Sequence, residues 1–265
     1  MQSCLAVLLS LCIAACKSTA IADSIWPPSD FEVSVEEVRL EGGAAKVVRR
    51  FRARADGIVS YATSSRAIVD AETSTHLPVF ESLSIYRLVP TSIRALARRI
   101  DRCGILGMDR VQGERGAPAD TSLVLVWQAF GRRQVVTARG RVHGAMADVL
   151  SIVMAHLPEG EAFQLPGLTD RPVVPVLRGV PVPRPDAAAA LQACRSLMEQ
   201  RPDDVVLMLD AFALACDLER RDEASQILQQ WLDATAGERR QQQMFPENVP
   251  RLTPDVLERL LPAES

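Results

Sequence analysis

Alternating apolar and polar residues in the first half of the chain predict a β-sheet. Phe31, Val33 and Val35 alternate with polar residues, as expected for a strand with one buried face. Branched and aromatic residues predict further strands at 48–53, 58–62, 79–88, 122–129 and 134–138. Asp56-Gly57 predicts a turn, because glycine tolerates a positive φ and aspartate can bond to its own backbone. Gly131-Arg132-Arg133 is expected to connect the last two strands.

Two amphipathic helices are expected among these strands. The first can be capped by Thr91 or Ser92 and ends at Gly104. Its apolar face is formed by Ile93, Leu96, Ala97, Ile100 and Cys103. The second covers about 145–156 and stops before Pro158. This order of elements predicts an α+β domain over residues 31–165, in which two helices cover one face of a small antiparallel sheet.

A proline-rich segment separates this domain from a helical one. Six prolines lie between Pro166 and Pro185, and proline offers no backbone donor to a helix or a sheet. Residues 166–185 are therefore predicted to form an extended linker, or a strap along the surface, at a domain boundary. Beyond it, aspartates can cap helices at 186–200, at 203 or 204–218 and at 222–234, and Thr253-Pro254 opens a last short helix.

The first and third of these C-terminal helices match each other at an offset of 34 residues. The matched pairs are Ala190 with Ala224, Cys194 with Leu228, and Leu197 with Trp231. With Pro202-Asp203-Asp204 closing the first unit, this period resembles the tetratricopeptide repeat over about one and a half repeats. The resemblance implies helical hairpins over 186–265, which would either form a peptide-binding groove or pack as a fragment on the front domain. Generic helical hairpins are the alternative.

The N-terminus carries an apolar run from Cys4 to Ala15, too short to cross a bilayer as a helix. Its length is typical of a signal peptide, although Met1, Gln2 and Ser3 carry no positive charge. Ile13-Ala14-Ala15-Cys16 resembles the lipobox of bacterial lipoproteins. The resemblance implies removal of residues 1–15, acylation of Cys16 and a lipid anchor in a membrane, with residues 16–30 as a tether.

The residue after Cys16 bears on which membrane is the destination. In bacterial lipoproteins an aspartate there often signals retention at the inner membrane, and this chain has Lys17. The resemblance therefore implies the periplasmic face of the outer membrane, where the host has one. The alternatives are an ordinary secretory signal cut near Ala20 or Ala22, which would give a soluble secreted or periplasmic protein, and a buried N-terminal helix.

Charge and composition indicate a folded protein that does not bind nucleic acid. Hydrophobic residues make up 48% of the chain and charged residues 24%, which are ordinary globular values. The net charge of −3 divides unevenly: residues 16–165 have 19 basic and 17 acidic side chains, and residues 166–265 have 11 and 16. Neither part has the basic excess that nucleic-acid binding requires.

Three cysteines remain if the leader is removed and Cys16 is acylated. Cys194 and Cys216 lie on consecutive predicted helices and can form a disulfide in an oxidising compartment, which leaves Cys103 single. The apolar pattern around all three favours buried free thiols instead. A nucleophilic Cys103 would need an exposed, electropositive site, so burial is the favoured interpretation there too.

No residue pattern identifies a catalytic, cofactor or metal site. His76, His143 and His156 lack the spacing of a zinc protease, and no phosphate-binding or dinucleotide-binding loop occurs. Asp109, Glu114 and Asp120 can in principle ligate a cation, but acidic loop residues are usually solvated. An envelope hydrolase or transferase with a scattered site, such as His76 with Asp109 or Asp120, is kept as an alternative function.

Arginines form two rows. Arg50, Arg52 and Arg54 point the same way on a predicted strand, and Arg49 is their neighbour. Arg94, Arg98 and Arg102, beside Arg99, form a stripe on the first helix. These rows can contact anionic lipid or an acidic partner, or they can be solvated faces beside nearby carboxylates.

The sequence as a whole favours a non-enzymatic cell-envelope lipoprotein whose C-terminal helices contact another protein. A purely structural envelope protein with no specific ligand is a further alternative.

Overall fold

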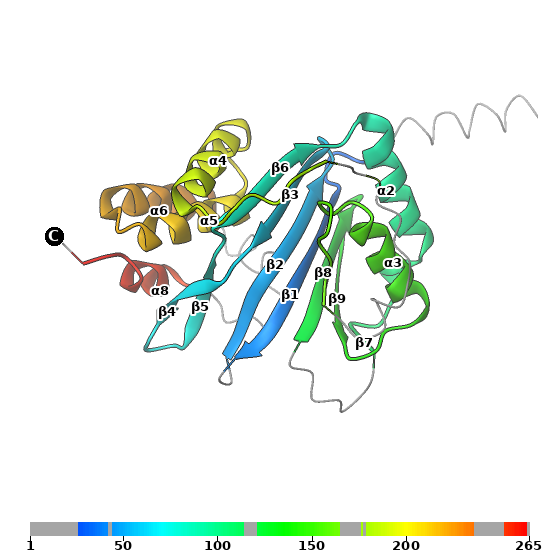
Figure 1. Cartoon of the computed structure of the whole chain (residues 1–265), viewed down its shortest axis with the longest axis horizontal. Coiled ribbons are helices and arrows are strands. Elements are labelled where there is room, and N and C mark those ends of the chain that lie inside the picture. The colour runs from blue at the N-terminus through cyan, green and yellow to red at the C-terminus, as the bar shows by residue number, and fades with distance from the viewer. Residues whose placement is uncertain are drawn as a thin grey trace, which may run out of the picture.

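The computed structural model describes residues 26–41, 44–113, 121–164, 176, 179–235 and 252–263. A seven-stranded sheet dominates this structure (Figure 1). In spatial order its strands are β6 (Ser82–Arg87), β3 (Ile58–Thr63), β2 (Ala44–Arg54), β1 (Glu32–Glu41), β8 (Thr121–Ala129), β9 (Arg132–Arg139) and β7 (Val111–Gly113). The prediction of a small antiparallel sheet is wrong on two counts: the sheet is large, and it is mixed, because β7 runs parallel to β9.

A second, two-stranded sheet pairs β4 (Arg66–Asp70) with β5 (Thr75–Val79). The sequence predicts one strand over 79–88, but the chain changes sheets there. β5 pairs with β4, whereas β6 begins at Ser82 and pairs with β3. The buried Glu81 lies at this change, and its carboxylate accepts a hydrogen bond from the backbone N–H of Ser65 at 2.8 Å. The contact between Glu81 and Ser65 therefore stabilises the change from β5 to β6. The residues are 16 positions apart, so the pattern within 79–88 does not predict it.

Two helices, α2 (Pro90–Arg102) and α3 (Gly144–Met154), cover one face of the large sheet, close to their predicted positions. Between them a short 3-10 turn, η1, spans Ile105–Gly107. The core on this side joins apolar residues of both helices to alternate residues of the central strands, including the fully buried Phe51, Leu125 and Trp127. The alternation predicts this packing, because period-2 residues share one face of a strand.

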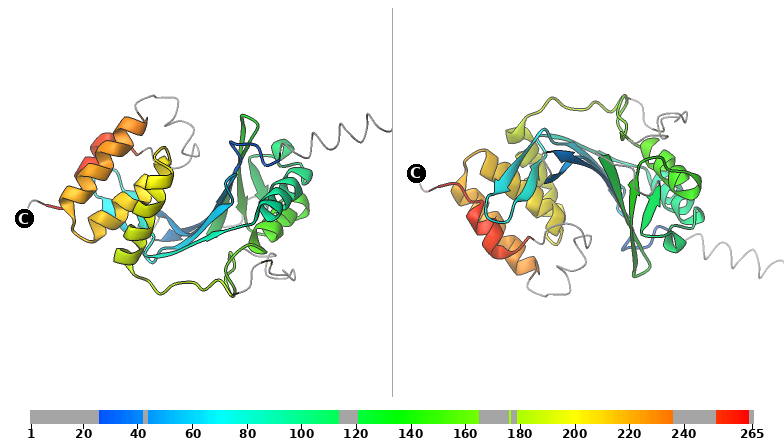
Figure 2. Two further views of the ribbon diagram at one scale, coloured as in Figure 1. Left: turned by 90° about the horizontal axis from the view of Figure 1, so that it is seen from above. Right: turned by 90° about the horizontal axis from the view of Figure 1, so that it is seen from below.

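Four more helices lie on the other side of the sheet: α4 (Ala187–Gln200), α5 (Val205–Asp217), α6 (Arg221–Thr235) and α8 (Pro254–Arg259). Figure 2 shows the curved sheet between the two groups of helices. The second core contains residues of α4, α5, α6 and α8 together with Ile58, Leu77 and Val79 from the strands. The helices therefore pack on the strands, and the picture of a sheet covered on a single face is also wrong.

Side-chain caps mark the starts of α4 and α5, whereas α6 begins at Arg221 and has Asp222, the residue expected to cap it, inside its first turn. Asp186 accepts a hydrogen bond from the N–H of Ala189 at 2.9 Å, and Asp204 accepts one from Leu207 at 3.2 Å. Such caps satisfy backbone donors that have no partner inside the helix. The predicted caps at Asp186 and Asp204 are confirmed.

Part of the proline-rich segment lies along strand β6. The hydroxyl of Ser82 donates to the carbonyl of Pro183 at 2.8 Å, and that of Ser84 donates to Pro181 at 3.1 Å. This part of the segment therefore runs as a strap over β6. Residues 166–175, 177 and 178 lie outside the described residues.

The arginine row of β2 faces the start of α5; Arg50 is buried, and Arg52 and Arg54 are half-buried. Arg50 donates to Asp210, and Arg52 and Arg54 donate to the two carboxylate oxygens of Asp204 at 2.6 and 2.9 Å. Arg50 also stacks over the ring of Phe80, 4.3 Å from its centroid. The prediction that these side chains point the same way is confirmed. They do not form a solvated face, because they pair with Asp204 and Asp210 at α5 and with Glu32 and Glu36 on β1.

Burial and ion pairing shift the pKa values of Asp204 and Asp210 in opposite directions. Burial alone would raise the pKa of Asp204, but Arg52 and Arg54 outweigh it and lower that pKa to about 2. At Asp210 burial outweighs the attraction of Arg50 and raises the pKa to about 6. Of the two aspartates, Asp204 is thus the one whose ionised form the fold stabilises.

Replacing Asp204 is expected to destabilise the protein at neutral pH. The change Asp204→Ala removes a carboxylate shared by Arg52 and Arg54, which leaves them only Glu32 of β1 among the described residues, and it removes the cap of α5. Removing one partner of a buried ion pair costs about 3 kcal/mol or more. Denaturant unfolding at pH 7 measures this loss. The matched control is Asp203→Ala, because Asp203 is exposed and its replacement is expected to change stability by about 0.5 kcal/mol or less.

Comparing the parent with Asp204→Ala at several pH values shows how the stabilisation by Asp204 depends on pH. A folded-state pKa below the unfolded value of 3.8 means that the stabilisation is complete above about pH 4 and is lost as the pH falls through about 2. The stability gap between the parent and Asp204→Ala is therefore expected to shrink by about 2 kcal/mol between pH 4 and pH 2. A gap that stays constant over this range contradicts the ion-pair assignment.

Candidate functional site

Helices α4 and α6 lie on either side of α5, and their sequences match at the 34-residue offset. They begin at Ala187 and Arg221, 34 residues apart, and α5 packs against both. The three pairs matched in the sequence are all buried: Ala190 with Ala224, Cys194 with Leu228, and Leu197 with Trp231. Because equivalent residues of the two helices are buried in the same core, the exposed residues between them line a common surface.

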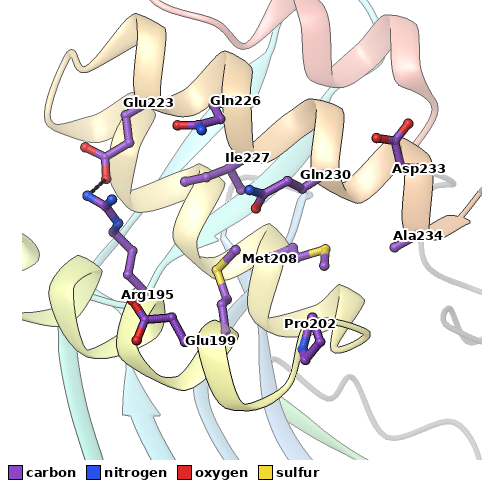
Figure 3. Close-up of a pocket in the computed structure, with 11 residues that line it drawn as sticks. Arg195, Glu199, Pro202, Met208, Glu223, Gln226, Ile227, Gln230, Asp233 and Ala234 are labelled. Atoms are coloured by element: carbon purple, nitrogen blue, oxygen red, sulfur yellow. Dashed lines mark hydrogen bonds and ion pairs between the residues drawn. The ribbon is translucent and has the colours of Figure 1, made fainter.

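That surface contains a groove of about 560 Å³ between α4 and α6 (Figure 3). Met198, Met208 and Ile227 form its apolar floor; Met208 and Ile227 are buried and Met198 is half-buried. Gln226, Gln230, Glu199 and Asp233 add polar side chains from the two helices, and Arg195, Glu223, Pro202 and Ala234 complete the lining. A flexible apolar floor with polar edges is typical of a surface that adapts to a peptide.

The charges of the groove are arranged unevenly along it. Arg195 donates to Glu223 at 2.9 Å, which ties α4 to α6 at one end, as Figure 3 shows. Glu199 has no hydrogen-bond or ion-pair partner among the described residues, and Asp233 accepts from Gln229 at 2.9 Å. Three acidic side chains therefore face one arginine in the lining. The amides of Gln226 and Gln230 supply neutral donors and acceptors between them.

The sequence pointed to these helices but did not single out the lining residues. The 34-residue offset also pairs Glu199 with Asp233, so the acidic position of the groove occurs in both units. Aligning the exposed residues of 186–200 with those of 222–234, and not only the buried ones, identifies that pair from the sequence. It does not identify Met208, which comes from α5 and has no counterpart in the match.

The three cysteines in the described residues are free thiols. Cys194 and Cys216 are buried in the second core, where burial raises the pKa of Cys216 to about 12 and raises that of Cys194 as well. Cys103 is half-buried, its sulfur contacts the carbonyl of Arg99 at 3.3 Å, and burial raises its pKa too. A raised pKa disfavours the thiolate, so none of the three has the environment of a nucleophile.

The residues of the alternative catalytic site are not brought together. His76 lies on β5, whereas Asp109 precedes β7, and these strands lie on opposite sides of the molecule in Figure 1. His156 is buried, where desolvation lowers its pKa. Glu114, Asp120 and Cys16 lie outside the described residues. Within the described ranges, no three His, Cys, Asp or Glu side chains are grouped to hold a metal.

No known family model and no curated protein matches this chain. The described helices include none with the length and apolar character of a membrane span.

The assignment of three free thiols predicts how many cysteines react with a thiol reagent. In the mature protein with Cys16 acylated, Ellman's reagent under denaturing, non-reducing conditions is expected to detect three thiols: Cys103, Cys194 and Cys216. Without denaturant, Cys194 and Cys216 are expected to stay unreacted, because they are buried. Detection of a single thiol in denaturant would instead indicate a bridge between Cys194 and Cys216.

Proposed function

We propose that this protein is a non-enzymatic lipoprotein of the cell envelope whose C-terminal helices bind another protein. Acyl chains on Cys16 hold it to the membrane, at the periplasmic face of the outer membrane where the host has one. The TPR-like pair of helices α4 and α6 presents the partner site. The groove between those helices is the observation that carries the proposal, because it combines an apolar floor with polar side chains at its edges.

The shape and the chemistry of the groove favour a protein ligand. An extended peptide can place an apolar side chain against Met198 and Met208, while glutamine amides bond to its backbone. Methionine side chains adapt to different apolar shapes at small energetic cost. The acidic excess of the lining favours a partner segment that is neutral or basic over an acidic one.

The lipid anchor is supported by Ile13-Ala14-Ala15-Cys16 and by the length of the apolar run before it. Each buried methylene of an acyl chain contributes about 0.8 kcal/mol to membrane binding, so two or three chains anchor a protein stably.

The change Cys16→Ser is expected to move the protein from the membrane fraction to the soluble fraction, because it removes the acylated thiol. Fractionation of cells that express the parent and the variant measures this, and intact mass shows whether the parent begins at an acylated Cys16. The matched control is Cys12→Ser, within the leader, which is expected to leave the partition unchanged. Equal membrane partition of the Cys16→Ser variant and the parent contradicts the anchor.

Partner binding is tested with a photo-crosslinking amino acid at Gln230, which lines the groove. The matched control position is Gln229, an exposed neighbour on the same helix that lines a separate hollow toward α8. In living cells a discrete crosslinked product is expected from position 230 and not from position 229. Equal products from both positions, or none from position 230, count against a partner in this groove.

A further inference from the structure

The first described residues of the chain are held against the turn between β8 and β9. The ring of Trp26 packs edge-on against that of Phe130, with centroids 5.0 Å apart. The carbonyl of Trp26 accepts a hydrogen bond from Nε of Arg94 on α2 at 3.0 Å. The chain therefore enters the fold beside the β8–β9 turn and the first turns of α2.

The β8–β9 turn carries a residue that its geometry disfavours. Phe130 and Gly131 are the two turn residues, with φ of 54° and 68°, so the predicted connection at Gly131-Arg132-Arg133 lies one residue too late. Two-residue turns with both φ values positive favour Asn-Gly, and a bulky side chain at the first position is strained. Asp30 supports the turn by accepting hydrogen bonds from the N–H groups of Phe130 at 2.9 Å and Gly131 at 2.6 Å.

This strained phenylalanine is also exposed. Half of the Phe130 surface (50%) is accessible to solvent. Val89, which precedes α2, is exposed by 59%, and Arg132 follows the turn as an exposed side chain. Phe130 strains the turn and leaves half of its surface exposed, so its side chain contributes little to the stability of the fold. This favours a role for Phe130 in binding another molecule.

Aromatic and basic side chains together suit the surface of a phospholipid bilayer. Tryptophan and phenylalanine favour the boundary between headgroups and acyl chains, and arginine binds anionic headgroups. Only ten residues separate Trp26 from Cys16, which limits their separation to about 35 Å even for a fully extended chain. An acylated Cys16 would thus keep this end of the sheet close to the membrane.

We propose that Trp26, Phe130 and Arg132 form a docking surface for an anionic phospholipid bilayer. The surface lies where the tether joins the fold, and Trp26 and Phe130 enter the interface while Arg132 contacts the headgroups. The proposal uses the anchor of the proposed function but does not use the groove. Docking at this end fixes the orientation of the protein on the membrane, whereas an anchor alone leaves the folded part free to rotate on its tether.

The tryptophans allow a direct test. The chain has three, and Trp127 and Trp231 are 0% and 1% exposed, so Trp26 is the one that a membrane quencher can reach. The mature protein is reconstituted into phosphatidylglycerol and phosphatidylethanolamine vesicles whose acyl chains carry bromine close to the headgroup. Quenching of tryptophan emission is expected for the parent and is expected to disappear in Trp26→Phe.

Two further variants separate the contributions of charge and of the aromatic ring. Arg132→Gln is expected to lower the ratio of docked to undocked protein roughly fivefold, since each arginine near an anionic surface contributes about 1 kcal/mol. Its matched control is Arg139→Gln, an exposed arginine at the other end of β9, which is expected to leave quenching unchanged. Phe130→Asn is expected to reduce quenching while it raises the denaturant midpoint, because asparagine suits a positive φ.

Intact mass of the same sample distinguishes the two proposals. An unmodified Cys16 contradicts the proposed lipoprotein. An acylated Cys16 with unquenched Trp26 contradicts only the docking surface. Quenching that persists equally in Arg132→Gln and Phe130→Asn also overturns the docking surface, because it would show that Trp26 meets lipid without the side chains assigned to that contact.

Discussion

The ion-paired row of arginines on β2 determines where the C-terminal helices can pack. Three guanidinium groups on one face of a strand cannot be covered by apolar helices, because burying an unpaired charge costs many kcal/mol. Helix α5 can pack against them because Asp204 at its N-cap and Asp210 join Glu32 and Glu36 of β1 in pairing with the row. The apolar contacts of α4–α6 with Ile58, Leu77 and Val79 then become available in the same position. Charge pairing thus specifies where the helices lie, and apolar burial supplies the favourable free energy.

This arrangement places the two proposed surfaces apart. The described chain begins beside α2, whereas α6 and α8 lie at the other end of the molecule, as Figures 1 and 2 show. A protein docked through Trp26 and Phe130 would therefore hold the groove of α4 and α6 away from the bilayer, where a partner can reach it. The sheet would then act as a spacer between the proposed membrane contact and the proposed protein contact.

The sequence predicts elements that depend on local signals and misses those that depend on pairing. The caps at Asp186 and Asp204 and the apolar face of α2 are local, and the structure has each of them near its predicted position. The split of 79–88 into β5 and β6 and the parallel strand β7 depend on partners far along the chain. The burial of the arginine row is missed for the same reason, since no local pattern shows that α5 will dock on β2. The turn at Phe130 is misplaced because its sequence contradicts the preference of its geometry.

We infer that the ion pairs between β2 and α5 couple the sheet and the C-terminal helices into one cooperative unit. Native-state hydrogen exchange in increasing denaturant, resolved by mass spectrometry to peptides from β1, β2, α5 and α6, tests this claim most directly. If the ion pairs couple the two parts, the slowest amides of α5 and β2 exchange through one global opening, with the same free energy and the same denaturant dependence. Exchange of α5 and α6 through a separate opening of lower free energy, while β1 and β2 stay protected, would contradict it.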